Sequence, residues 1–396
     1  MGGEWTRVAV GDLLRDGVLE IGDGYRARNA ELSAHGLPFA RAGNLKRGFD
    51  FSEADRVPPA TLRHVGRKQS CPGDVVFTSK GTVGRFAYVT GETEPFVFSP
   101  QLCFWRSQSA ERLDSRFLFF WFHSRECAEQ LEVLKGQTDM ADYISLRDQR
   151  TMVIALPPIA DQRAIASVLG ALDDKIESNR RLVRHARDVL TAAFERIGSE
   201  AVDMTTLGSL GQVVGGGTPK SSQPSYWEPA DVPWITPKDI TALAGVPVIG
   251  RGSRAISQDG LRRSSAKLLP TGSVVYTSRA TLGLVAITQQ PLATNQGFIS
   301  LVPHQRFGSA FVYAALVACR EAINAEANGS TFLEVNKTNF KVVQCPRPSD
   351  EAIAGFRAVA DPLIATVSSV LREARTLAAL RDVLLPKLVS GQVRVR

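Results

Sequence analysis

The residue patterns that usually mark an enzyme are missing from this 396-residue sequence. GGGTPKS at 215–221 places Lys220 after proline and does not have the spacing of the G-x-x-x-x-G-K-[ST] loop that cradles nucleotide phosphates. Neither Pro58-Pro59 nor Pro157-Pro158 has the Asp or Asn before it and the aromatic after it that adenine methyl transfer requires. The five histidines show no metal-ligand spacing. We therefore expect no catalytic residues and no metal site in this chain.

The side chains that remain are suited to binding. Two short stretches, TSKGT at 78–82 and TSRAT at 277–281, combine hydroxyl and cationic groups in corresponding places. Arg, Lys, Asn and Gln reach base edges in nucleic acids, and basic and hydroxyl groups contact phosphates. The alternative is an ordinary turn whose hydroxyls satisfy backbone groups. The candidate binding residues are Arg41, Asn44, Thr78, Ser79, Lys80, Gln101, Lys220, Lys238, Thr277, Ser278, Arg279, Asn295 and Gln296, with Thr236 in the place of Arg41.

These candidates recur because the chain repeats itself. PGDVVFTSKGTVG at 72–84 aligns with TGSVVYTSRATLG at 271–283, and LPFARAGNL at 37–45 aligns with VPWITPKDI at 232–240. FSPQ at 98–101 aligns with ATNQ at 293–296, and the GQT that begins at Gly136 aligns with the GST that begins at Gly329, all in the same order. An internal duplication of one globule follows.

Each globule shows short β-branched and aromatic runs punctuated by Gly, Pro and Ser, which predict strands at 74–79, 85–90, 273–278 and 284–289. Apolar periodicity predicts helices over 115–134 and 309–324. This mixture favours the α+β class, with two similar α/β globules, over a doubly wound parallel sheet.

Each globule is followed by a long helix with apolar residues at alternating steps of four and three, the pattern of a coiled-coil seam. A helix over 158–197 would be about 60 Å long at roughly 1.5 Å per residue, so we expect it to pair antiparallel with a second helix over 347–388. Docking of each helix on its own globule is the alternative. Pro362 should kink or restart the second helix, and Arg381 interrupts its stripe. The predicted seam residues are Ile165, Leu169, Leu172, Ile176, Asn179, Val183, Leu190, Ile364, Val367 and Leu371, with Asn179 fixing the register.

Bulk properties agree with a binding protein. The net charge of +7 weakly favours a polyanionic partner. No apolar run approaches the roughly 18 residues that span a bilayer, and the first residues lack signal-peptide order, so we expect a cytoplasmic protein. Five scattered cysteines without a CxxC pair predict buried, inert thiols.

Three segments resemble a known family. LPPIADQRAIASVLGALDDKIESNRRL at 156–182 is similar to the central conserved region of the specificity subunits of type I restriction-modification systems. GGGTPKSSQPSYWEPADVPWITPKDI at 215–240 resembles the opening of that family's target recognition domains, and LLPKLVSGQVRV at 384–395 resembles its C-terminal ending. Residues 20–36 of the first copy lack the GGGTPK form.

The resemblance implies a non-catalytic, DNA-binding subunit. Target recognition domains at 1–156 and 201–346 would each read one half of a bipartite site, and helices at 157–200 and 347–396 would set the gap and dock the modification subunits. Partner modification and restriction subunits would bind S-adenosylmethionine, ATP and Mg, and would carry out adenine methylation and ATP-dependent cleavage. A coiled-coil scaffold that binds no DNA is the alternative, and a fused enzyme is a third reading.

Overall fold

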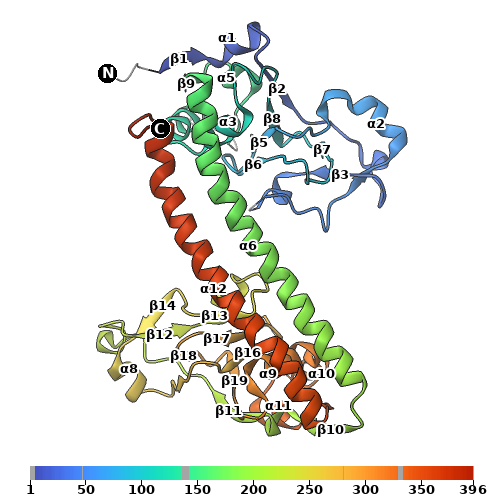
Figure 1. Ribbon diagram of the computed structural model, residues 1–396, viewed down its shortest axis with the longest axis vertical. Helices are drawn as coiled ribbons and strands as arrows, with labels where there is room; N and C mark the ends of the chain where they lie inside the picture. The colour runs from blue at the N-terminus through green and yellow to red at the C-terminus, as the bar shows by residue number, and fades with distance from the viewer. Residues whose placement is uncertain (1–4, 47, 136–141, 280, 329–332, 396) are drawn as a thin grey trace. The chain divides into compact units, whose positions relative to one another are not determined.

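The computed structural model describes residues 5–46, 48–135, 142–279, 281–328 and 333–395 (Figure 1). The chain forms two compact units. Unit 1 contains Met1–Lys175 together with Leu377–Arg396, and unit 2 contains Ile176–Thr376. The unit boundaries lie within the two long helices, so each unit includes part of both helices. The domain boundaries predicted from the sequence instead place each long helix in a segment of its own, at 157–200 and 347–396.

Unit 1 holds a four-stranded sheet of order β2-β8-β5-β6, a smaller sheet of order β4-β3-β7 and the antiparallel pair β1-β9. Strand β3 runs parallel to β7, and the other pairs are antiparallel. The elements are β1 (Thr6–Ala9), α1 (Val10–Arg15), β2 (Leu19–Asp23), β3 (Leu37–Ala40), β4 (Arg56–Val57), α2 (Pro59–Val65), β5 (Val75–Thr78), β6 (Phe86–Tyr88), β7 (Val97–Phe98), β8 (Leu102–Ser107), α3 (Ser115–Phe122), α4 (Arg125–Lys135), α5 (Leu146–Gln149) and β9 (Val153–Leu156).

Unit 2 repeats this plan with a five-stranded sheet of order β11-β19-β16-β17-β13, a four-stranded sheet of order β14-β12-β18-β15 and the pair β10-β20. The elements are β10 (Asp203–Thr206), β11 (Gly211–Gly215), β12 (Val232–Ile235), α7 (Pro237–Thr241), β13 (Val248–Ile249), β14 (Arg254–Ile256), α8 (Gln258–Arg262), β15 (Leu268–Leu269), β16 (Val274–Thr277), β17 (Val285–Thr288), β18 (Leu292–Thr294), β19 (Phe298–Pro303), α9 (Gly308–Ala318), α10 (Arg320–Ala325), α11 (Lys337–Val342) and β20 (Gln344–Arg347).

The predicted α+β class and the internal duplication are confirmed. The four predicted strands are β5, β6, β16 and β17. Strand β12 runs parallel to β18 as β3 does to β7, which is the arrangement the repeat requires. The GQT and GST landmarks at 136–138 and 329–331 lie outside the described residues.

One close backbone approach fixes the alignment of the two units. A Cβ atom on Gly24 would lie 1.9 Å from the carbonyl oxygen of Ser99, and a Cβ atom on Gly216 would lie 1.9 Å from that of Asn295. Only glycine allows this approach, because any side chain would overlap the carbonyl. Gly24 and Gly216 therefore occupy equivalent positions even though the sequence around Gly24 lacks the GGGTPK form.

Each single helix predicted over 115–134 and 309–324 is instead two helices. Helix α3 ends at Phe122, and buried Ser124 accepts a hydrogen bond from the backbone N–H of Cys127 (3.1 Å) in the first turn of α4. Cys319 separates α9 from α10 in unit 2, where no side chain caps the start of α10. Apolar periodicity continues across both breaks, which is why it did not reveal them.

The long helices are α6 (Ile159–Ser199) and α12 (Asp350–Val389), and Figure 1 shows them side by side. In unit 2 the rings of Phe194 and Phe356 are 6.3 Å apart, and Asn179 contacts Glu373, so the residue numbers of the contacts run in opposite directions and the helices are antiparallel. In unit 1 the Asp173 carboxylate accepts a hydrogen bond from Arg381 (2.9 Å). The arginine that interrupts the apolar stripe thus joins the two helices.

Much of the predicted seam lies in the cores of the units. Ile165 and Leu169 are buried in unit 1 with Leu385 and Leu388 of α12. Val183, Leu190 and Val367 are buried in unit 2, where Ile364 and Leu371 pack at the edge of the same core. Ile176 and Asn179 are buried, and Leu172 is half-buried. Both descriptions, pairing with the other helix and docking on a unit, therefore apply to the same helices.

The predicted restart at Pro362 is wrong, because α12 continues through it. Proline removes the N–H that would bind the carbonyl of residue 358 and its ring crowds that carbonyl, but the helical residues on both sides of Pro362 continue the helix. One 18-residue window of α12 is apolar enough by length and composition to cross a membrane. Of that window 22% is buried, and Phe356, Ala360 and Val367 of α12 lie in the core of unit 2.

Candidate nucleic-acid interface

The loop after β5 is held by its own hydroxyls. Thr78 Oγ1 donates to the carbonyl of Thr82 and accepts from the backbone N–H of Arg85 (3.1 Å). The backbone N–H of Ser79 donates to the carbonyl of Gln101 (2.9 Å). Thr78 and Ser79 are both buried, so their hydroxyls stabilise the turn and leave Lys80 as the exposed candidate.

The loop after β16 is built in the same way. Thr277 Oγ1 donates to the carbonyl of Thr281 and accepts from the backbone N–H of Leu284 (2.9 Å), and the backbone N–H of Ser278 donates to the carbonyl of Gly297 (2.8 Å). Thr277 and Ser278 are buried. The alternative, a turn whose hydroxyls satisfy backbone groups, therefore describes the side chains of Thr78, Ser79 and Thr277, and Ser278 is held through its backbone N–H.

The exposed cations of the two loops differ in their partners. Arg279 forms an ion pair with Glu334, with 2.6 Å between Nε and Oε1. The backbone of Lys80 pairs instead with that of Tyr143, which occupies the place of Glu334 and carries no charge. Lys80 has no ion pair with any residue in the described part of the chain, so the unit 1 loop presents the more available charge.

Arg41 and Asn44 lie in a turn after β3. Asn44 Oδ1 accepts from the backbone N–H of Arg41 (2.8 Å), and Arg41 pairs with Asp55 (2.6 Å). After β12 the same reciprocal turn joins Thr236 and Asp239, not Lys238, so Asp239 is the counterpart of Asn44. Asn44 and Asp239 therefore shape their turns, whereas Arg41 and Lys238 are exposed.

Hydrogen bonds from Thr236 and Ser253 give Asp239 a lowered pKa. Burial raises the pKa of this carboxyl, but bonds from the backbone N–H groups of Thr236 (2.8 Å) and Ser253 (2.8 Å) and from the Thr236 hydroxyl outweigh it and hold the pKa below its ordinary value. The carboxylate at the start of α7 is thus stabilised in its charged form.

The third candidate pair is shifted by one residue. Ser99 donates its backbone N–H to Ala40, and Asn295 donates to Ile235, so the counterpart of Ser99 is Asn295. Gln101 consequently aligns with Gly297 and not with Gln296. The segments FSPQ and ATNQ both end in Gln, and this shared residue had suggested that Gln101 aligns with Gln296.

The three amides of this pair make local contacts. Gln101 is exposed, and its Oε1 accepts from the backbone N–H of Ala42 (3.2 Å). Asn295 Oδ1 accepts from the N–H of Gly297 (2.9 Å), and the exposed Gln296 bonds to Thr218. The three amides therefore hydrogen-bond to groups near them, and Gln101 and Gln296 lie at the surface.

Lys220 is presented by a loop that two indoles hold. Trp227 Nε1 donates to the carbonyl of Lys220 (3.2 Å), and Trp234 Nε1 donates to that of Gly217 (3.0 Å). The guanidinium of Arg254 lies 3.8 Å from the centre of the Trp227 ring, a cation–π arrangement. The sequence analysis missed Trp227 and Arg254; the SYW segment at 225–227 marks the first, and no pattern in the sequence marks the second.

The side chains at these loops are suited to binding. Exposed cations and amides occupy matching loops in the two units, and no group of three or more His, Cys, Asp or Glu that could hold a metal ion occurs among the described residues. Basic side chains on a surface with exposed amides are suited to contacting a polyanion.

Comparisons with known proteins identify this arrangement. The family model described as "Type I restriction modification DNA specificity domain" matches residues 16–183 and 199–356, one match for each copy of the repeat. The chain is similar to the Type I restriction enzyme MjaIX specificity subunit of Methanocaldococcus jannaschii (36% identity over 151 residues, 38% of this chain and 34% of that protein). It is also similar to the EcoR124I/EcoR124II specificity subunit of Escherichia coli (31% identity over 214 residues, 50% of each chain).

A solved structure has the same fold. The type I restriction-modification system S subunit from M. genitalium superposes with a TM-score of 0.62 at 15% identity, covering 97% of this chain and 96% of that one. The alignments with the two curated relatives span half of their length or less. The chain belongs to the type I restriction-modification DNA specificity family and carries two copies of its domain.

Proposed function

We propose that this chain is the sequence-reading subunit of a type I restriction-modification complex, with each unit reading one half of a bipartite double-stranded DNA site. The observation that supports this most directly is the repeated loop. Lys80 lies in the loop after β5, and Arg279 lies in the equivalent loop after β16. Because the exposed side chains around the two loops differ, the two half-sites would differ in sequence.

In this proposal α6 and α12 set the number of base pairs between the half-sites and dock the modification subunits. Those partners bind S-adenosylmethionine and methylate adenine, and restriction subunits supply ATP- and Mg-dependent cleavage. This chain itself contributes no catalytic residue or cofactor. The complex works where the DNA is, so the proposed location is the cytoplasm.

Footprinting tests the bipartite reading. The chain assembled with modification subunits from its host should protect two short DNA segments that flank an unprotected gap. The affinity should fall steeply between about 50 and 200 mM salt, because several phosphate charges are neutralised and their counterions released. Protection of one continuous segment would contradict the model.

Charge reversal separates DNA binding from assembly. Lys80→Glu with Arg279→Glu should weaken DNA binding while the subunits still assemble, and Arg125→Glu serves as the control because Arg125 is an exposed cation on α4 (side chain 88% exposed). A DNA-free scaffold would lose neither property in the loop variants. Full DNA affinity in the loop variants would contradict the placement of Lys80 and Arg279 at the DNA, and assembly without any DNA affinity of the natural chain would favour the scaffold alternative.

A further inference from the structure

The two units treat one equivalent position differently. Asp23 and Gly215 come directly before the equivalent glycines Gly24 and Gly216, and each ends the edge strand of its sheet. In unit 1 the Asp23 carboxylate pairs with Lys68, with 2.9 Å between Oδ1 and Nζ. Lys68 also donates to the carbonyl of Gly24 (2.8 Å). The lysine of unit 1 is thus neutralised within the chain.

Unit 2 keeps the lysine and lacks the carboxylate. Lys267 lies seven residues before β16, as Lys68 lies seven residues before β5, and the backbones of the residues that follow them pair with equivalent strands. The counterpart of Asp23 in unit 2 is Gly215, which has no side chain to pair with Lys267. Nothing at this position of unit 2 replaces the negative charge.

A second lysine adds to the charge in unit 2. Lys337 is the first residue of α11, after the helix-capping Asn336, and Leu146 follows the equivalent cap, Ser145, in unit 1. A Cβ atom on Gly215 would lie 3.3 Å from Lys337 Nζ, so the ammonium stands where a side chain at 215 would point. Unit 1 has one cation and one anion here, whereas unit 2 has two cations.

Both lysines line one groove of about 560 Å³, which we name the Lys267–Lys337 groove. Gly215, Gly216 and Ser265 contribute to its wall. Neither lysine lies within 4.0 Å of a carboxylate in the described ranges, and both are exposed. Two uncompensated ammonium groups flanking an open space attract an anion, and Lys is a common ligand of phosphate as a point charge.

We propose that the Lys267–Lys337 groove binds a phosphate of the DNA backbone, in the place that the Asp23 carboxylate takes in unit 1. This inference rests on the proposed function and adds a contact that anchors unit 2 without reading sequence. It also makes the two units unequal: unit 2 holds DNA at a point where unit 1 is already neutralised.

Placing the carboxylate of unit 1 into unit 2 tests the proposal. Gly215→Asp should neutralise the groove, and Gly215→Asn is the matched control of the same shape without charge. Gly215 does not have a positive φ, and the nearest atoms to a new Cβ belong to the flexible Lys337 side chain, so both variants can be accommodated. Thermal melting of both variants checks that they fold.

The measurement is the affinity of the full-length chain for a labelled duplex of arbitrary sequence, because phosphate contacts do not depend on sequence. The slope of log affinity against log salt should be shallower by about 0.9 in Gly215→Asp than in Gly215→Asn, the value for one lost phosphate contact. Lys337→Ala should also make this slope shallower than that of the natural chain. Equal slopes in Gly215→Asp and Gly215→Asn would overturn the proposal.

Inorganic phosphate distinguishes a DNA phosphate from a free one. Millimolar phosphate that raises the melting temperature of the natural chain but not of Gly215→Asp, with equal DNA slopes, would show a free-anion site and overturn the DNA assignment. A natural chain that binds no duplex even when it is assembled with modification subunits would overturn the proposed function itself. A slope that is shallower in Gly215→Asp than in Gly215→Asn supports the inference.

Discussion

Asn179 Nδ2 donates a hydrogen bond to Glu373 Oε2 over 2.9 Å and joins α6 to α12 inside unit 2. The same nitrogen lies 3.3 Å from the carbonyl oxygen of Val370, and Asn179 is only 3% exposed. A buried polar contact of this kind favours one register of a helix pair over its neighbours, because any slip leaves the amide without partners.

Asn179→Ala should destabilise unit 2 by about 1–3 kcal/mol, since it removes the hydrogen bonds from a buried amide to the Glu373 carboxylate and to the Val370 carbonyl. Denaturant unfolding followed by circular dichroism measures the change. Ser178→Ala, at the adjacent exposed position of α6, is the control and should have little effect. If the two variants are equally stable, the contact does not hold the pair.

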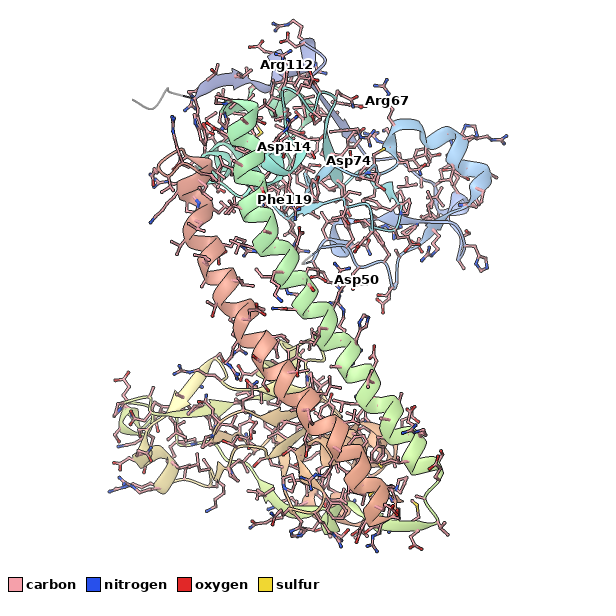
Figure 2. All side chains as sticks on the ribbon, in the orientation of Figure 1. Asp50, Arg67, Asp74, Arg112, Asp114 and Phe119 are labelled. Carbon is pink, nitrogen blue, oxygen red and sulfur yellow. The ribbon has the colours of Figure 1, made fainter. Side chains whose placement is uncertain are left out.

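Asp74 and Arg106 form a bidentate ion pair in unit 1, with 2.6 Å from Arg106 Nε to Asp74 Oδ1 and 2.8 Å from Nη2 to Oδ2. Asp74 is completely buried, and Figure 2 shows it inside the unit, whereas Arg67 projects from the surface. Asp74→Ala should cost about 3–5 kcal/mol, because it removes both short bonds to the Arg106 guanidinium and leaves only Glu20, 3.9 Å away, as a charged partner. The equivalent residue of unit 2 is Ser273, and Ser273→Ala should cost much less. A small loss in Asp74→Ala would contradict this account.

The lowered pKa of Asp239 predicts a pH dependence for unit 2. A carboxyl whose pKa is lower in the folded state than its unfolded value of about 3.9 stabilises the fold above that pH, and the contribution is lost as the pH falls through the folded pKa. Asp239→Asn should therefore be less stable than the natural chain at pH 7, with a difference that shrinks below about pH 4. Urea unfolding at several pH values measures this. A difference that does not change with pH would exclude Asp239 as its source.

Glu334→Gln should strengthen DNA binding at low salt, because it releases Arg279 from its ion pair and removes a negative charge from the loop. Anisotropy titrations with a labelled duplex measure the affinity. Tyr143→Phe, at the corresponding place in unit 1, changes no charge and should leave the affinity unaltered. Unchanged binding in Glu334→Gln would indicate that the Arg279 loop does not face DNA.

Thiol reactivity should distinguish one cysteine from the other four. Cys71 is half-buried, whereas Cys103, Cys127, Cys319 and Cys345 are buried, so the prediction of buried thiols is wrong for Cys71. Burial raises the pKa of Cys103 and Cys127, which disfavours their reactive thiolates. Ellman's reagent should modify one thiol quickly in the native protein and five in denaturant. The absence of the fast-reacting thiol in Cys71→Ser would confirm the assignment, and its presence in this variant would refute it.

The duplication and the long helices could be predicted because they depend on local patterns. The apolar runs of β5 and β16 are nearly the same, and the steps of four and three in α6 follow from helix geometry. The direction of a side chain could not be predicted in the same way. Thr78 and Thr277 have the residue type of a binding group, and only the hydrogen bonds to their own loops show that they face inward.

Contacts between distant segments account for the other differences. The alignment of Gln101 with Gln296 followed a shared letter, whereas the strand pairing follows the bonds to Ala40 and Ile235. Lys337 was missed because its counterpart is Leu146, and a search for repeated residues overlooks what only one copy has. A groove charge depends on which residues meet in space.

The composition of unit 1 has a consequence for the order of events during synthesis. Leu385, Leu388 and Val389 of α12 are buried in the same core as Val10 and Leu13, and the ring of Trp5 lies against Gly391. The first unit to leave the ribosome is therefore the last to be completed. Until residues from 377 onward emerge, the core of unit 1 lacks the side chains that α12 contributes. Unit 2 ends at Thr376 and by then already has all of its own residues.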